Sequence, residues 1–486
     1  MQQYIYIIGV ALTWVMIAAA IVHVVMDNRQ PAKTMAWALV IFFVPVVGLV
    51  FYLFFGLNHR KERLIDERSL DQLSKRSMWS FVEQQDLNVP ERYRQLVDLF
   101  AGQSLSLPFR VGGVDALTDG YAFTFSLLAD IAQARHHIHM EMYIIDDDAL
   151  GRLVADALTD RARQSVRVRI VYDDVGCWHT GHRFFERLRA AGVEVAPFLP
   201  VRFPQFTSKV NYRNHRKLIV IDGRVGYIGG MNIARRYAAA TWHDLMLRME
   251  GGIVYALQRA FLVDWYFVDR TLITGREYYP AAANPAPQEQ TDGAAATTHA
   301  ERLRGTAQMV TSGPTTAYPE IMQGYVRAIM GARRYIYIET PYFLPTDPVF
   351  FALKTAAATG VDVHILVPLR NDSWFVEWAS RSYLREAHAA GIKVSLYSAG
   401  FLHTKLMVCD GEVCTCGSTN VDFRSFENNF EANVFVYDES TARRLADLFL
   451  ADLEHAVSLA AIPARLHPGF IHRLWESLTR LFSPLL

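Results

Sequence analysis

Residues 215–222 read His-Arg-Lys-Leu-Ile-Val-Ile-Asp, and residues 403–410 read His-Thr-Lys-Leu-Met-Val-Cys-Asp. Both stretches follow one pattern, His-x-Lys-x4-Asp. The continuous apolar run in the first copy is typical of a strand that is buried on both faces. Because side chains two positions apart project from the same face of a strand, each copy presents an imidazole beside an ammonium group. The pattern therefore predicts two strands, each preceded or begun by a histidine and a lysine that could take part in chemistry.

The segments around the two motifs also repeat, with a spacing of roughly 190–200 residues. In each copy a strand-like run is followed by a helical stretch and a second strand-like run, and an Ala-Gly pair then precedes a third. The matched runs are 138–144 with 336–343, 166–172 with 361–367, and 191–195 with 390–394. This alternation is an α/β pattern, so we predict two similar α/β domains with largely parallel strand pairing.

The rest of the chain divides around these domains. We place the first domain at residues 108–278 and the second at 306–455, separated by an Ala/Pro/Thr-rich linker at 279–305 that cannot bury much apolar surface. A connecting segment spans 58–107, and an amphipathic tail spans 456–486. The formal charge of +0, from 49 basic and 49 acidic residues, gives no global attraction to a polyanion. The four cysteines form no disulfide framework, and we expect reduced thiols.

Residues 1–57 contain two long apolar runs, 4–25 and 35–55, without a charged side chain. Each run is close to the ~20 residues that a helix needs to cross a bilayer, so we predict a two-helix transmembrane hairpin. Pro45 and Gly48 lie inside the second run and predict a kink. More Arg and Lys side chains follow the second run than lie between the runs. This bias favours a multi-pass protein of the inner, cytoplasmic membrane with catalytic domains that face the cytoplasm.

A second short signature follows each motif, Gly-Gly-Met-Asn at 229–232 and Gly-Ser-Thr-Asn at 417–420. Its glycines allow close backbone approach, and its asparagine supplies a neutral amide donor. An acidic residue comes later, Asp244 at 29 residues after His215 and Glu431 at 28 residues after His403. We expect such a carboxylate to hold the Nδ1–H of its histidine and to leave Nε2 for attack or proton transfer.

These groups converge on one phosphodiester site if the two domains pack face to face about a pseudo-twofold axis. The predicted catalytic residues are His215, Lys217, Asp222, His403, Lys405 and Asp410. Phosphate binding is assigned to Asn232, Asn420 and Ser418, and orientation of the histidines to Asp244 and Glu431. We expect no metal and no cofactor, because a lysine beside each histidine repels a divalent cation.

At these residues the chain resembles the phospholipase D superfamily, and its layout resembles the bacterial cardiolipin synthases over nearly the full length. Further stretches that carry the resemblance are Ser312-Gly313-Pro314, Asn371-Asp372-Ser373 and Asn429-Phe430-Glu431. The resemblance implies transfer of a phosphatidyl group from one phosphatidylglycerol to another, with release of glycerol. It also implies that His215 forms a phosphohistidine and that His403 acts as acid and then as base. Hydrolysis of phospholipid and transfer to another alcohol stay open as alternatives.

The implied partners are phosphatidylglycerol, other anionic phospholipids and the bilayer. Nucleic acid is not expected as a partner, since a nuclease needs a basic track for the backbone phosphates. The oligomeric state stays open. Two segments are candidates for contact with a bilayer surface: residues 198–206, which mix aromatic side chains with Arg202, and the tail, with apolar side chains at helical spacing from Phe470 to Phe482. The tail pattern is equally compatible with packing on the second domain.

Overall fold

The computed structural model describes residues 2–26, 31–52, 56, 87–104, 106–201, 211–280, 305–316 and 318–485. Most of the predicted connecting segment and linker, and residues 202–206 of the predicted interfacial segment, lie outside these ranges. The chain divides into two compact units, Met1–Arg63 with Val201–Tyr212, and Leu64–Pro200 with Arg213–Leu486.

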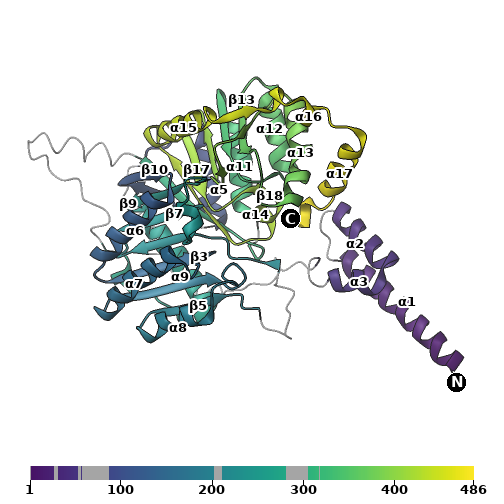
Figure 1. The fold of residues 1–486 in the computed structure, drawn as a ribbon, viewed down its shortest axis with the longest axis horizontal. Helices are drawn as coiled ribbons and strands as arrows, with labels where there is room; N and C mark the ends of the chain where they lie inside the picture. Colours follow the sequence, from purple (N-terminus) through teal and green to yellow (C-terminus); the bar gives the residue numbers. More distant parts are fainter. Residues whose placement is uncertain are drawn as a thin grey trace, which may run out of the picture. The chain divides into compact units, whose positions relative to one another are not determined.

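The smaller unit contains three helices among its described residues (Figure 1), namely α1 (Gln2–Met26), α2 (Pro31–Phe43) and α3 (Pro45–Phe51). Ile17 and Val24 of α1 pack with Ile41 of α2 in a small apolar cluster. The other side chains of α1 are mostly exposed and apolar.

The second apolar run is divided at Val44. This residue has φ −133°, outside the helical region, because the ring of the following Pro45 disfavours the helical conformation before it. The interruption predicted at Pro45 is therefore present, and it produces two short helices. Among the described residues, only Tyr6–Met26 is long and apolar enough to cross a membrane, so the predicted two-helix transmembrane hairpin is not confirmed.

The first domain contains a seven-stranded sheet with the order β2-β9-β7-β6-β3-β4-β5. Helices α6, α7 and α8 share one apolar core with it, and α9 contacts it as well. The strands are β2 (Gly113–Leu117), β3 (His137–Met142), β4 (Arg167–Asp173), β5 (Glu194–Phe198), β6 (Leu218–Ile221), β7 (Val225–Gly229) and β9 (Met246–Glu250). The helices are α6 (Gly120–Gln133), α7 (Ala149–Arg163), α8 (His182–Ala190) and α9 (Ile253–Asp269).

The second domain repeats this sheet as β10-β19-β17-β16-β11-β13-β14, with β1 and β20 added at its two edges. The strands are β1 (Phe109–Val111), β10 (Gly305–Ser312), β11 (Tyr335–Glu339), β13 (Asp362–Pro368), β14 (Lys393–Tyr397), β16 (Leu406–Cys409), β17 (Val413–Gly417), β19 (Glu431–Tyr437) and β20 (Ala456–Ser458). The helices are α5 (Arg94–Ser104), α11 (Glu320–Gly331), α12 (Asp347–Ala358), α13 (Trp374–Ala389) and α15 (Glu439–Leu453).

Strand direction corrects one prediction. Within the two large sheets, only β3-β4-β5 and β11-β13-β14 are parallel, whereas the motif strands β6 and β16 are antiparallel to both of their neighbours. The expectation of largely parallel pairing is therefore wrong for the half of each sheet that carries the motif. A hairpin rather than a crossover helix follows each motif strand, and tight hairpins join antiparallel strands. The two predicted α/β domains themselves are confirmed.

Both hairpins turn on an Asp-Gly pair. Asp222 and Gly223 have φ of 53° and 63°, and Asp410 and Gly411 have φ of 57° and 67°. A two-residue turn of this kind requires positive φ at both central positions, which explains the choice of residues. The aspartate that ends each motif thus has a folding role at the turn.

Strand β1 and helix α5, which precede the first repeat in the sequence, pack on the second domain. β1 pairs with β10, and Leu96 and Phe100 of α5 lie in the second domain's apolar core. The first domain's own sheet therefore begins at Gly113 rather than at residue 108. All four cysteines are buried free thiols, as the sequence predicts.

Candidate active site

The two domains meet through reciprocal backbone contacts at the motif histidines. The His215 N–H donates to the Phe430 carbonyl at 2.9 Å, and the His403 N–H donates to the His243 carbonyl at 2.7 Å. Each of these carbonyls belongs to the residue directly before the acidic residue of the other domain. Such an exchange of equivalent contacts is what an approximate twofold relation between the domains produces.

The acidic residues therefore act across the domains. Glu431 accepts from His215 Nδ1, with distances of 3.0 and 3.2 Å to its two oxygens, and Asp244 accepts from His403 Nδ1 at 2.6 Å. We expected each acid to serve the histidine of its own motif. A spacing of 28 or 29 residues cannot distinguish the two arrangements, because the contact depends on how the domains pair.

The two carboxylates have different surroundings. Glu431 also accepts from Ser418 Oγ and from Asn429 Nδ2, the latter at 3.1 Å. Asp244 accepts from the Leu245 N–H at 2.8 Å. A side chain at position 230 would lie 2.1 Å from the Asp244 carboxylate, so Gly230 is required there. Gly230, at the position that Ser418 has in the second copy, therefore leaves the space that the Asp244 carboxylate occupies.

Both motif lysines are buried beside their histidines. Lys217 Nζ donates to the His215 carbonyl at 2.6 Å and lies 5.1 Å from the centre of the Tyr143 ring, which also contacts His215. Lys405 Nζ donates to the His403 carbonyl. Burial lowers the pKa of Lys217 to about 7, and it lowers that of Lys405 as well. The site thus holds two ammonium groups that are ready to gain a negative partner.

Both histidines are neutral at pH 7 in the free site. Burial lowers the pKa of His215 to about 4, against the opposing effect of Glu431. Burial and then the Lys405 ammonium lower the pKa of His403 to about 3. Lys405 also lowers the pKa of His215, and Lys217 that of His403, so the charges of the two motifs act on a common site.

Asp222 and Asp410 lie at the far ends of the motif strands from the histidines. Asp222 accepts from the backbone N–H groups of residues 135, 136 and 137 at 2.7–2.9 Å. Asp410 accepts in the same way from residues 333, 334 and 335, and it pairs with Arg92 at 2.6 Å. Seven residues separate each aspartate from its histidine, and an extended chain of that length spans about 23 Å. The predicted catalytic role is therefore corrected to a structural one.

The predicted phosphate-binding residues differ in how far protein groups already use their hydrogen-bonding atoms. Asn232 accepts from the Ile144 N–H at 3.0 Å and donates to the Tyr237 hydroxyl, so both ends of its amide have protein partners. Ser418 is engaged with Glu431. The buried Asn420 oxygen has no hydrogen-bond partner within the described part of the chain. An amide oxygen accepts and does not donate, so the atom that Asn420 leaves free suits a hydroxyl group of a ligand rather than a phosphate oxygen.

Sequence reasoning missed the side chains that hold the segment before His215. Asp173 accepts from the Asn214 N–H at 2.8 Å and pairs with Arg213 at 3.5 Å. The Asn214 amide donates to Glu141. Glu141 occurs on β3, which pairs with the motif strand β6, and Asp173 occurs on β4, the next strand of the sheet. Polar residues in otherwise apolar buried strands were the signal that could have revealed them.

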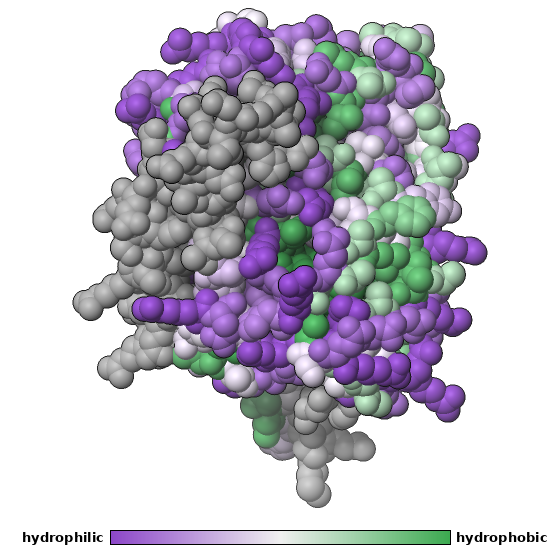
Figure 2. All heavy atoms as spheres, turned by 90° about the vertical axis from the view of Figure 1, so that its left-hand side faces the viewer, coloured by the Kyte–Doolittle hydropathy of each residue, from purple (hydrophilic) through white to green (hydrophobic). Residues whose placement is uncertain are grey.

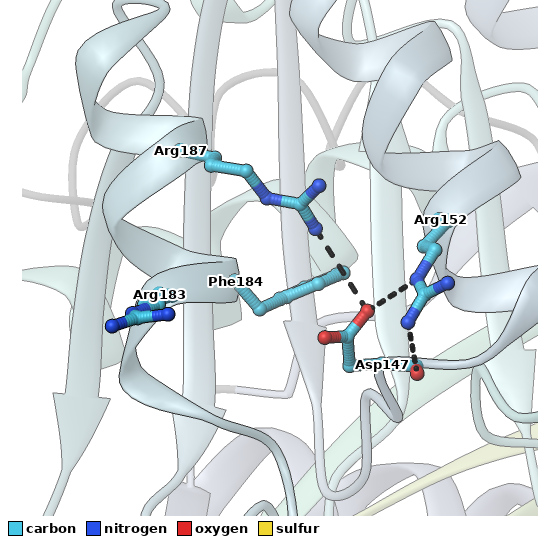
Figure 3. A pocket seen from close by; sticks show the side chains of 5 residues that line it. All are labelled: Asp147, Arg152, Arg183, Phe184 and Arg187. Atoms are coloured by element: carbon cyan, nitrogen blue, oxygen red, sulfur yellow. Dashed lines mark hydrogen bonds and ion pairs between the residues drawn. The ribbon is translucent and has the colours of Figure 1, made fainter.

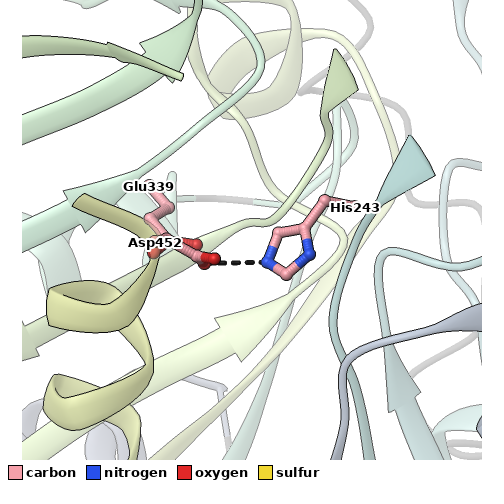
Figure 4. A group of neighbouring side chains, drawn as sticks. All are labelled: His243, Glu339 and Asp452. Carbon is pink, nitrogen blue, oxygen red and sulfur yellow. Dashed lines mark hydrogen bonds and ion pairs between the residues drawn. The ribbon is translucent and has the colours of Figure 1, made fainter. Parts of the chain in front are cut away.

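Each domain also holds two acidic side chains close together near its motif, Glu141 and Asp264 in the first and Glu339 and Asp452 in the second. In the first domain, Arg216 pairs with Asp264, beside Glu141. Thr404 stands at the position of Arg216 in the second domain. There His243, from the first domain, donates to Asp452 at 2.7 Å beside Glu339 (Figure 4).

These three side chains, His243, Glu339 and Asp452, offer ligand atoms within 4.8 Å of one another. Their oxygen and imidazole donors suit a divalent cation by type. However, burial, and secondarily the Asp452 charge, raise the pKa of Glu339 well above its usual value. His243 thus pairs with Asp452 in the second domain as Arg216 pairs with Asp264 in the first.

A separate surface hollow lies between α7 and α8 (Figure 3). Arg152 donates to Asp147 at 2.6 Å, and Arg187 lies 3.8 Å from the same carboxylate. Arg183 and Phe184 complete its lining, and no motif residue takes part. This hollow is therefore distinct from the histidine site.

Comparison with known proteins first defines the class. The structure of phosphatidylserine synthase from Haemophilus influenzae matches with a TM-score of 0.61 at 13% identity, over 82% of this chain and 100% of that chain. The family model described as "Cardiolipin synthase, PLD-like domain" matches residues 127–265 and again 325–453. The model described as "Phospholipase_D-nuclease N-terminal" matches residues 15–56. The chain is thus a member of the phospholipase D superfamily with two such domains.

Relatives over the full length narrow the family. The cardiolipin synthase of Alkalihalophilus pseudofirmus is 38% identical over 471 residues, covering 95% of this chain and 90% of that protein. That of Halalkalibacterium halodurans is 36% identical over 496 residues, covering 99% and 95%. The chain belongs to the bacterial cardiolipin synthase family, and it is a phosphatidyltransferase, as the resemblance implied.

Proposed function

We propose that this chain joins two phosphatidylglycerol molecules into cardiolipin, with release of glycerol, through two successive displacements at phosphorus. One observation carries the proposal. Two histidines, His215 partly buried and His403 buried, each have Nδ1 held by a carboxylate of the other domain, at 3.0 and 2.6 Å, and a buried lysine follows each histidine by two residues. This contact fixes the tautomer in which Nε2 is the reactive nitrogen.

In the first displacement, His215 attacks the phosphorus of one phosphatidylglycerol. With a pKa lowered to about 4, its Nε2 lone pair is available at neutral pH. The P–N bond forms as the bond between phosphorus and the glycerol oxygen breaks, and His403 donates a proton to that oxygen. The bound phosphate anion raises the pKa of His403 from its low value in the free site, so the acid gains its proton as substrate binds.

In the second displacement, a hydroxyl of another phosphatidylglycerol attacks the phosphohistidine. His403 accepts the hydroxyl proton while the new P–O bond forms and the P–N bond breaks. Lys217 and Lys405 stabilise the charge on the equatorial oxygens in both steps. The assignment of attack to His215 follows the resemblance to the superfamily, in which the first histidine usually has this role.

We further propose that the chain is a multi-pass protein of the inner membrane with its catalytic domains facing the cytoplasm. The helix Tyr6–Met26 supports one crossing. A second crossing would use α2 and α3 together, which are end to end across the break at Val44. The balance of Arg and Lys on either side of the second apolar run supports the orientation.

The direct test supplies the purified full-length protein with phosphatidylglycerol alone and identifies the products by mass spectrometry. Cardiolipin and glycerol in equal amounts are expected, with none from a His215→Ala variant as the matched control. Phosphatidic acid with glycerol would instead identify a hydrolase, since water would then be the acceptor.

A further inference from the structure

The C-terminal helix α17 (Phe470–Arg480) packs against α13 (Figure 1) through its polar side. Glu476 is buried and pairs with Arg385 at 2.7 Å. Arg480 donates to Ser382 at 3.0 Å and to Glu386 at 2.9 Å. A helix on a protein body normally places its apolar stripe inward, so this helix is docked with the opposite orientation.

The apolar side of α17 and the residues after it are exposed. Phe470 and Ile471 are 80% and 79% exposed, and Leu481 is 74% exposed. The other exposed apolar side chains of this segment are Leu474, Trp475, Leu478 and Phe482. The sequence left open whether this stripe packs on the second domain. Within the described residues, most of the stripe does not pack there, and only its Trp475 and Phe482 contact the start of α13.

The start of α13 extends the same surface. Trp374 is 59% exposed, and its ring lies 6.0 Å from that of Trp475. Phe375 contacts Phe482 at 5.7 Å between ring centres. Figure 2 shows the opposite side of the molecule, where hydrophilic and hydrophobic side chains are interspersed. We call the surface formed by α17, residues 481–482 and residues 374–375 the α17 surface.

We propose that the α17 surface is inserted into the headgroup region of an anionic phospholipid bilayer, and that it presents the catalytic body to its substrate. This inference rests on the proposed function, because a phosphatidyltransferase must take its substrate from a lipid surface. Exposed apolar surface of this extent marks an interaction site. Tryptophans at the edge and the exposed Arg473 beside the apolar side chains match the composition of interfacial helices on anionic lipid.

A single label tests the depth of this surface in the full-length protein. Because all four native cysteines are buried, Ile471→Cys introduces a thiol that reacts selectively. An environment-sensitive fluorophore is attached there, and the protein is reconstituted in vesicles of phosphatidylglycerol and phosphatidylethanolamine. The matched control is Arg163→Cys, at an exposed position on α7.

We expect nitroxide-labelled lipid to quench the label at position 471, and aqueous iodide to quench only the label at position 163. Quenching of position 471 by iodide would show that the surface faces water and would overturn the proposal. Protection from both quenchers would show that protein covers it, either another part of the chain or a second copy, and would also overturn the proposal. This measurement needs no turnover, so a protein without synthase activity can still pass or fail it.

The functional consequence is tested with the double variant Phe470→Ser, Ile471→Ser. Turnover of vesicle-bound phosphatidylglycerol should fall severalfold, whereas turnover of a dispersed short-chain analogue should be retained. Equal loss with both substrates would contradict the proposal, because it would indicate damage to the body rather than to lipid contact.

Discussion

The contacts across the domains predict that the two acidic residues control different chemical steps. Glu431→Gln removes the negative charge 3.0 Å from His215 Nδ1 and leaves one oxygen where two had accepted from His215, Ser418 and Asn429. As His215 bonds to phosphorus, its ring gains positive charge. The carboxylate stabilises that charge by ~4 kcal/mol at an effective dielectric constant of about 20. The loss corresponds to a decrease in rate of about three powers of ten.

The assay is a single-turnover reaction with a phosphatidyl ester of p-nitrophenol, which needs no proton on its leaving group. Glu431→Gln should slow the release of p-nitrophenol by about 10³-fold. Asp244→Asn should leave this release almost unchanged, because Asp244 holds the acid His403 at 2.6 Å and not the nucleophile. In that variant the phosphohistidine should accumulate, since His403 no longer accepts the proton of the acceptor alcohol.

Mapping the phosphorylated histidine makes the reasoning refutable. If the phosphate is on His215 and yet Asp244→Asn prevents its formation, each acid serves its own motif and the contact across the domains is wrong. If the phosphate is on His403 and Asp244→Asn prevents its formation, the contact stands and the roles of the two histidines are reversed.

Three further predictions follow from the buried charges. Lys217→Met should abolish turnover but raise the melting temperature at pH 7, because it removes a buried ammonium group. The pKa of Lys217 is about 7 in the folded chain and has its ordinary value of 10.5 in the unfolded chain, so the unfolded chain binds more protons between these pH values. Burial of the charge therefore costs on the order of a few kcal/mol of stability at low pH, and this cost is relieved only as the pH rises through that window. A variant that is less stable at pH 7 would contradict this reading. Asp222→Asn should lower the free energy of unfolding by about 1–3 kcal/mol, measured in urea, with turnover retained, because Asn tolerates the positive φ but loses the charge that holds three N–H groups. Turnover should persist in EDTA, since lysines neutralise the phosphate; loss that one divalent ion restores would argue for a cation at His243, Glu339 and Asp452.

Local patterns predicted most of the site, because the reactive groups lie on one short motif. His215 and Lys217 are near neighbours in sequence, and the turn after Ile221 is encoded by Asp-Gly. The role of Asp222 was misjudged since a motif suggests joint chemistry for all its members, whereas a strand of ordinary rise carries this aspartate far from the histidine. A short motif in the sequence does not show whether each of its residues lies at the catalytic end of the strand or at the turn.

Contacts between distant segments could not be read from the sequence. The contact of Glu431 with His215 depends on the docking of two domains, and strand direction depends on whether a hairpin or a crossover follows. The inverted docking of α17 was equally hidden, because a helical pattern shows two faces but not which one the body covers. Only the structure shows that Glu476 and Thr479, on the polar side of the helix, are the buried residues.

The reciprocal contacts at the histidines have a consequence for how such an enzyme could arise. Neither half contains a complete histidine–carboxylate pair, since the histidine of each half is oriented by the carboxylate of the other. An ancestor with one copy of the motif could work only as a twofold dimer, in which every substitution appeared on both sides of the site. A single chain with two copies has no such constraint. Arg216 and Thr404, and likewise Gly230 and Ser418, occupy equivalent positions of the two copies and differ, which allows one histidine to specialise in bonding to phosphorus and the other in moving protons.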